Sequence, residues 1–160
     1  DGKAGMNNWN DSIKRGAVSG SLTAVLSALA LGALGKRDSG SAVAPINSVS
    51  HWLYGEKAKY QDAASARFTI PGYLTHHISA IFWAVLFERF AGRLLDRKDP
   101  VITLEAAAVT TAVACFVDYK LTPQRLQPGF EARLTRTSMV GVYAAIGLGL
   151  ALGAMLVRRR

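Results

Sequence analysis

Four long runs with almost no charged residue constrain the fold more than any other feature of this chain. They cover residues 16–35, 68–87, 100–117 and 137–157, and Glu105 is the single charged residue within them. An α-helix needs about 20 apolar residues to cross a bilayer core of about 30 Å. A soluble chain of 160 residues can bury one such helix, but four would leave too little amphipathic cover to shield them from water. The runs therefore predict four transmembrane helices.

The predicted fold class is all-α: a polytopic membrane protein, folded as a four-transmembrane-helix bundle in a single membrane domain of residues 1–160. Local signals mark the ends of the third helix. Asp99 followed by Pro100 is an N-cap and N1 pair that opens it, and Pro123 stops it just beyond the membrane. The predicted spans cover about residues 16–35, 68–90, 100–119 and 137–157.

The first long loop, residues 36–67, is too long for a plain connection. It contains a predicted short interfacial helix at about residues 46–54, closed by Gly55 as a glycine C-cap. We expect this helix to lie on the membrane surface, since it is amphipathic. Its apolar face comprises Ile46, Val49 and Leu53, with Trp52 and Tyr54 at the membrane interface.

The start of the chain partly imitates a secretory signal peptide. Lys14 and Arg15 precede the first apolar run, and Ala42-Val43-Ala44 resembles a cleavage site. Pro45 would directly follow the cut, however, and the run is longer than the usual hydrophobic region of a signal peptide. We therefore expect the first run to be a membrane span.

The chain is basic, with 19 Lys+Arg against 11 Asp+Glu and a formal net charge of +8. Basic residues beside membrane spans attract anionic lipid headgroups, each by roughly 1 kcal/mol. A lipid bilayer with anionic headgroups is therefore the predicted partner. A nucleic-acid partner is not predicted, because the sequence lacks a basic stripe interleaved with stacking aromatic residues.

Four spans place both termini and the loop of residues 88–99 on one side of the membrane. The loops of residues 36–67 and 118–136 then lie on the other side. Lys and Arg are almost equally numerous on the two sides, so the positive-inside rule discriminates weakly. The basic residues of the terminal side sit close to the span ends, so we expect the termini in the cytoplasm. Glu88 is expected to pair with the neighbouring arginines, and residues 158–160 to anchor the last span.

Two spans carry small residues at every fourth position. In a bilayer this pattern lets helix backbones approach closely, and close approach is a main source of helix association there. The stripes predict close packing, either within the chain or with another copy. The first stripe comprises Gly16, Gly20, Ala24, Ala28 and Gly32, and the second comprises Gly141, Ala145, Gly149 and Gly153.

The candidates for a functional site are polar residues at the end of the predicted bundle that carries the loops of residues 36–67 and 118–136. Ionisable residues inside membrane spans are costly to bury and so are functional candidates by default. Successive spans cross the membrane in opposite directions. The first long loop, the start of the second span and the end of the third span therefore lie at the same membrane face. The candidate residues of this polar cluster are His51, His76, His77, Asp118, Tyr119 and Arg133.

Three interpretations of this polar cluster are open. Adjacent histidines on a helix point about 100° apart, so a metal or haem site would need one of them together with His51 or Asp118. A carboxylate bonded to an imidazole can instead relay protons near neutral pH. Alternatively, Asp118 and one histidine form a neutralised contact between helices while the other histidine faces the interface. We assign no catalytic residue and no metal-ligand set, because no side chain has a recognisable nucleophile setting.

Three segments resemble those of small uncharacterised bacterial inner-membrane proteins with four spans. The segments are Thr75-His76-His77-Ile78-Ser79-Ala80-Ile81-Phe82-Trp83-Ala84, Asp118-Tyr119-Lys120-Leu121-Thr122-Pro123 and Pro128-Gly129-Phe130-Glu131. The resemblance covers about residues 45–155. It implies a bacterial inner (cytoplasmic) membrane, and it implies no activity or cofactor.

The sequence favours a non-enzymatic integral membrane protein. In this hypothesis the chain is a structural or accessory subunit that assembles through its small-residue faces, in a homo-oligomer or with a membrane-protein partner. One alternative is a small transporter or proton-conducting protein that uses His76 or His77 with Asp118. A second alternative is a haem- or metal-binding membrane protein.

Overall fold

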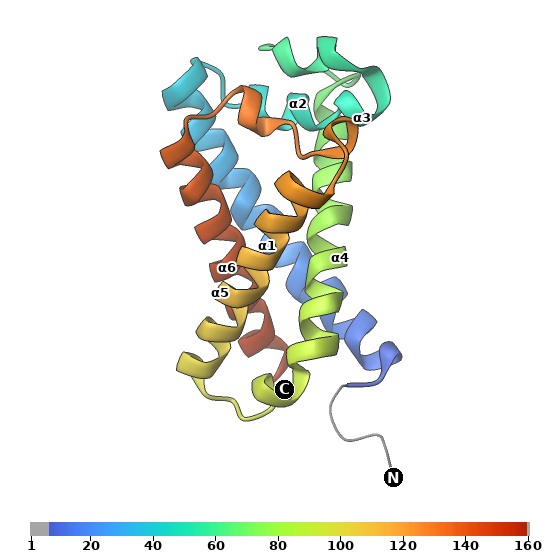
Figure 1. Cartoon of the computed structure of the whole chain (residues 1–160), viewed down its shortest axis with the longest axis vertical. Helices are drawn as coiled ribbons and strands as arrows, with labels where there is room; N and C mark the ends of the chain where they lie inside the picture. The colour runs from blue at the N-terminus through green and yellow to red at the C-terminus, as the bar shows by residue number, and fades with distance from the viewer. Residues whose placement is uncertain (1–6, 160) are drawn as a thin grey trace.

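Long helices stand side by side in the computed structural model (Figure 1). The structure describes residues 7–159, and its regular elements within that range are all helical. Lys3, which lies on the predicted terminal side, and Arg160, part of the predicted anchor, are outside the described residues. The long helices of the described range are α1 (Trp9–Ser39), α4 (Thr69–Leu95), α5 (Pro100–Phe116) and α6 (Arg136–Val157).

Three helices of the described residues are long and apolar enough to cross a membrane. They are Trp9–Ser39, Pro100–Leu121 and Arg136–Val157, and they correspond to the first, third and fourth predicted spans. Helix α4 corresponds to the second predicted span and is not among these three. The described residues thus form an all-helical structure that is consistent with a membrane protein, with one fewer membrane-length apolar helix than predicted.

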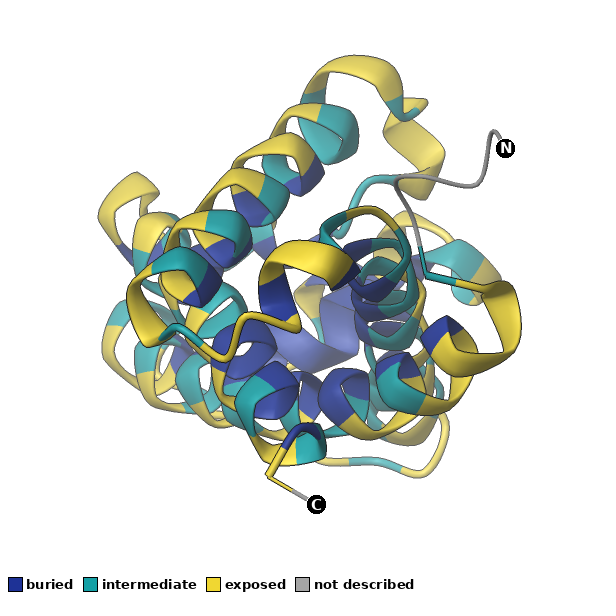
Figure 2. Cartoon of the chain, turned by 90° about the horizontal axis from the view of Figure 1, so that it is seen from below, coloured by how far each residue is buried: buried dark blue, intermediate teal, exposed yellow. Residues whose placement is uncertain are grey.

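Large apolar side chains cover the outside of this bundle. Figure 2 shows buried residues facing the centre and exposed residues facing outward. Exposed large apolar side chains occur on each long helix, among them Val25, Ile78, Val109 and Leu148. Such a surface suits lipid tails, and it would be an association hazard in water.

Helix α5 begins and ends as its sequence dictates. The Asp99 carboxylate accepts hydrogen bonds from the backbone N–H groups of Val101 at 2.8 Å and Ile102 at 3.2 Å, and Pro100 takes the first turn. At its other end the helix widens into a π-helical turn, η2 (Val117–Leu121). The Thr122 N–H donates to the Val117 carbonyl at 2.8 Å, which closes this wider turn before Pro123.

Helix α1 packs closely against both α4 and α6. Glycines make these contacts backbone to backbone. An added Cβ would lie 2.5 Å from the Ile81 Cα if placed on Gly20, and 2.7 Å from the Thr23 Cα if placed on Gly149. An added Cβ would be similarly close to the Val85 Cα on Gly16, at 2.7 Å, and to the Ser19 Cα on Gly153, at 2.6 Å. The two small-residue stripes therefore make close contacts within the chain at these positions.

The remaining stripe residues have looser surroundings. Ala24 is fully buried, whereas Ala28, Gly32, Gly141 and Ala145 are half-buried. A Cβ on Gly32 would meet only the Ala42 carbonyl oxygen, at 3.5 Å, which is an ordinary van der Waals distance. The close contacts are therefore concentrated in the half of α1 nearer to its N-terminus.

The predicted interfacial helix at residues 46–54 is instead two short helices, α2 (Ala44–Val49) and α3 (His51–Tyr54), followed by the 3-10 helix η1 (Glu56–Tyr60). Every residue of α2 is buried by protein. Pro45 packs on Gly35 of α1, and the Ile46 carbonyl packs on Gly72 of α4. Helix α2 therefore closes one end of the bundle, and the expectation of an amphipathic surface helix is corrected for this part.

The loop after α5 completes this closure. It contains two single-turn 3-10 helices, η3 (Gln124–Leu126) and η4 (Phe130–Ala132). Between them Gly129 has a φ of 93°, which favours glycine. A side chain there would also collide with the His51 ring and the Ser48 carbonyl.

A buried ion cluster fastens the opposite end of the bundle. Arg158 donates to both carboxylate oxygens of Glu88, at 3.0 and 2.8 Å, and to Asp96 at 2.9 Å. Glu88 is completely buried, so the expected interfacial pairing with neighbouring arginines is replaced by a bidentate bond to the end of α6. Burial opposes the charge of Arg158, but the hydrogen bonds to Glu88 and Asp96 raise its pKa above the ordinary value.

Replacing Gly20 by alanine should destabilise the bundle, because the methyl group would overlap the α4 backbone. Overpacking of this kind costs about 1–3 kcal/mol, and we expect a melting temperature in mild detergent at least about 3 °C lower. Gly32→Ala is the matched control on the same helix, where the methyl group fits and alanine favours the helix. Equal melting temperatures for the two variants would contradict the α1–α4 contact.

Replacing Arg158 by glutamine should destabilise the chain by about 3–5 kcal/mol, because Glu88 would keep a buried charge without its partner. Arg159→Gln is the control, since Arg159 is the exposed neighbour and surface changes usually stay within about 0.5 kcal/mol. Thermal unfolding of both variants in the same detergent makes the comparison. Two indistinguishable arginine variants would show that the cluster does not fasten α6.

Candidate functional site

A cavity of about 420 Å³ lies among the long helices, toward the end closed by α2 and by the loop that follows α5. Along α6 it lies between two apolar clusters, one that includes Val142 and one that includes Ala151 and Ala154. Helix α5 packs mainly against α6 and less extensively against α4. The pocket therefore occupies the space where α4, α5 and α6 diverge, with α1 behind it.

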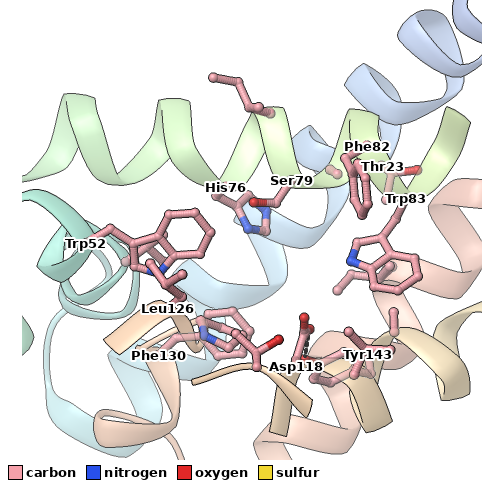
Figure 3. Close-up of a pocket in the computed structure, with 18 of the residues that line it drawn as sticks. Thr23, Trp52, His76, Ser79, Phe82, Trp83, Asp118, Leu126, Phe130 and Tyr143 are labelled. Carbon is pink, nitrogen blue, oxygen red and sulfur yellow. Dashed lines mark hydrogen bonds between the residues drawn. The ribbon is translucent and has the colours of Figure 1, made fainter. Parts of the chain in front are cut away.

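Aromatic rings form much of the pocket wall (Figure 3). The Phe82 and Trp83 rings meet edge to face, with centroids 5.5 Å apart. On the opposite side, the Phe130 and Tyr143 rings are 6.4 Å apart. Trp52 of α3 completes the wall, and its indole N–H donates to the Gln127 carbonyl at 2.9 Å, which fixes the ring.

Asp118 presents its carboxylate to this aromatic pocket. It sits in the π-helical turn η2, and such turns occur frequently at functional sites. The Tyr143 hydroxyl donates to its Oδ2 at 2.6 Å, and Figure 3 shows the carboxylate directed into the cavity. The next residue, Tyr119, lines a separate groove between α5 and α6, where its hydroxyl donates to Glu131 at 3.2 Å.

His76 lines the pocket from α4, across the cavity from Asp118 (Figure 3). Its Nε2 lies 2.8 Å from the Ser27 hydroxyl oxygen of α1. Ser27 already donates its own proton to the Thr23 carbonyl, at 2.7 Å. A neutral imidazole satisfies this bond with Ser27.

His77 points to a different part of α1. Its Nε2 lies 3.0 Å from the Ser21 hydroxyl, and its Nδ1 lies 3.2 Å from the Tyr73 hydroxyl. The two histidines thus bond two serines of α1, while Asp118 bonds Tyr143 of α6. The pocket separates Asp118 from His76, whereas the proton-relay and neutralised-contact interpretations of the sequence both joined a histidine directly to Asp118.

The other two predicted site residues lie at the closed end of the bundle. His51 is buried, and its Nδ1 donates to the Ser48 carbonyl at 2.8 Å. Arg133 pairs with Asp62 of the first long loop. Across the described residues, no group of three or more His, Cys, Asp or Glu lies close enough together to hold a metal ion.

Sequence reasoning missed the residues that give the pocket its shape. Ser79 and Trp83 lie on the inner face of α4, and neither was a candidate. The exposed residues Leu74, Ile78 and Phe82 recur every four positions along the helix. At 3.6 residues per turn, residue 83 lies about 140° and residue 79 about 100° around the helix from this exposed stripe, so the period would have placed both away from the exposed face.

Comparison of the chain with models of protein families, with curated proteins and with solved structures gave no match. The pocket is interpreted from its own geometry. Ligand pockets usually enclose about 300–1,000 Å³ and combine mostly apolar walls with a few directed polar groups. A cavity of about 420 Å³ with aromatic walls and the polar side chains of His76, Ser79 and Asp118 has these properties.

Proposed function

We propose that this chain is a non-enzymatic integral membrane protein with four spans, of which α4 is the second. The outer face of α4 supports this, because every exposed position from Ile70 to Phe90 is apolar. The polar residues His76, His77 and Ser79 are buried or half-buried on the inner side. The exposed stripe comprises Ile70, Leu74, Ile78, Phe82 and Phe90.

The proposed location is a bacterial inner membrane, with both termini in the cytoplasm. The resemblance of residues 45–155 to bacterial inner-membrane proteins supports the membrane. The orientation is supported by basic residues close to the helix ends on the terminal side, among them Arg15 and Arg158. Anionic headgroups would be attracted to the exposed basic residues at that end.

Within this membrane protein, the pocket would bind a lipid-soluble small molecule, as in a small transporter. One observation carries this proposal: polar side chains from different helices face an unfilled volume inside the bundle. Polar groups inside a membrane bundle are costly, so a purely structural bundle would gain by filling this volume with apolar side chains. The π-helical turn that presents Asp118 is a further local departure from regular packing.

The lining of the pocket includes lipid-facing residues of α4, which provide a route of entry from the bilayer. Ile78 and Phe82 line it from α4, and their side chains are 67% and 56% exposed on the lipid-facing surface. Thr122, Leu126 and Pro128 line it from the loop that follows α5. A molecule dissolved in the bilayer would thus reach the pocket beside α4, and the loop lies between the pocket and the aqueous side.

A role as an accessory subunit is the second candidate. The close contacts of Gly16, Gly20, Gly149 and Gly153 are made within the chain, so those positions do not supply a free assembly surface. A groove between α5 and α6, lined in part by Ala108, Ala112, Ala144 and Gly147, does face outward. A fixed stoichiometric partner in mild detergent would favour this role.

Filling the pocket should abolish ligand binding. The neutral fluorophore N-phenyl-1-naphthylamine is a suitable apolar probe, and its binding can be measured as saturable quenching of tryptophan emission in lipid nanodiscs. Ser79→Phe places a ring in the cavity, and we expect affinity at least about tenfold weaker, equivalent to about 1.4 kcal/mol.

The control is Leu74→Phe, which adds the same ring to the same helix at an exposed position outside the pocket lining. This variant should bind the probe as the unaltered chain does. If the unaltered chain shows no saturable binding, or if both variants bind equally well, the pocket is not a ligand site.

A further inference from the structure

We infer that the pocket selects a monovalent, lipophilic organic cation. This inference rests on the proposed ligand-binding function and names the chemical class of the ligand. The observation behind it is the combination of one carboxylate with a wall of aromatic rings. Among the described residues that line the pocket, Asp118 is the sole acidic residue, and none is lysine or arginine.

The surroundings of Asp118 leave room for a positive charge from outside the chain. Its Oδ2 accepts one hydrogen bond, from the neutral hydroxyl of Tyr143. Asp118 is half-buried, and carboxylates in apolar surroundings are normally paired with a cationic side chain, because an unpaired charge there is costly. Glu88 at the other end of the bundle shows the usual solution, since Arg158 binds both of its oxygens. Asp118 has no such side chain beside it in the pocket lining.

The aromatic wall suits the body of an organic cation. Aromatic faces carry negative potential and attract cations within about 6 Å of the ring centre, most strongly when the cation is desolvated. Trp52, Trp83, Phe130 and Tyr143 all border the same cavity as Asp118 (Figure 3). A cation bearing apolar or aromatic groups would thus contact rings on several sides while its charge is balanced by the carboxylate.

The same geometry disfavours an inorganic ion. Calcium takes 6–8 oxygen ligands, and magnesium demands an octahedral shell. The carboxyl group of Asp118 supplies two oxygens, and the surrounding wall is mostly apolar. A lipophilic cation needs no such shell, because its charge is already spread over or shielded by its substituents.

Tetraphenylphosphonium and tetraphenylborate form a matched pair of probes, with similar size and shape and opposite charge. Calorimetric titration of the unaltered chain in zwitterionic nanodiscs should show saturable binding of the phosphonium. In the Ser79→Phe protein the pocket is filled, so titration of this protein in the same nanodiscs measures the heat of probe partition into lipid. This heat is subtracted from the heat measured with the unaltered chain. We expect the phosphonium to bind at least about tenfold more tightly than the borate.

Asp118→Asn should remove this preference, because asparagine has almost the same shape and no charge. Its binding of neutral N-phenyl-1-naphthylamine should persist, which reports that the pocket is still folded. The charge preference itself is measured by comparing the phosphonium and the borate on the unaltered chain. That measurement does not depend on whether the Asp118→Asn variant folds.

The outcomes separate the two proposals. Equal binding of the phosphonium and the borate, with neutral-probe binding that Ser79→Phe abolishes, would overturn the cation inference and leave the ligand pocket standing. A phosphonium preference that survives in Asp118→Asn would overturn the role of the carboxylate. Failure of all three probes to bind would overturn both the pocket and its selectivity.

Discussion

The close contact of α1 with both α4 and α6 is the constraint on which the rest of the structure depends. At Gly20 and Gly149 the backbones of neighbouring helices touch, and no side chain separates them. Helix α1 therefore fixes the positions of α4 and α6 relative to each other. Helix α5 packs on α6 and, less extensively, on α4, and Thr23 of α1, which touches Gly149, also lines the pocket.

The two ends of the bundle hold the pocket in place by different interactions. One end is fastened by the buried pair of Glu88 and Arg158, which links α4 to the end of α6. At the other end α2 is buried under the two loops, with the Ser48 carbonyl and the His51 ring packed against Gly129. Both closures are polar and buried. Their polar partners meet in one geometry, so each closure fixes a more specific alignment of helices than apolar packing alone would.

The helical fold and most helix positions could be predicted from the sequence, because runs without charge and an Asp-Pro pair act locally. The burial of α2 could not be predicted, because its six residues combine apolar and small polar types that also suit a membrane surface. The partner of Glu88 is 70 residues away in the chain, and local spacing suggested nearer arginines. His76 and Asp118 were identifiable as polar residues within apolar runs, but the cavity between them depends on how four helices diverge.

Helix α4 is proposed to turn its exposed apolar face toward lipid. Spin labels at Leu74 and Ile78, in a Cys115→Ala background, test this most directly through collisions with oxygen and with a water-soluble nickel chelate. A label at the exposed loop residue Ala64 provides the aqueous reference. The account predicts frequent collisions with oxygen and rare collisions with the chelate at both α4 positions. Chelate access at Ile78 equal to that at Ala64 would contradict it.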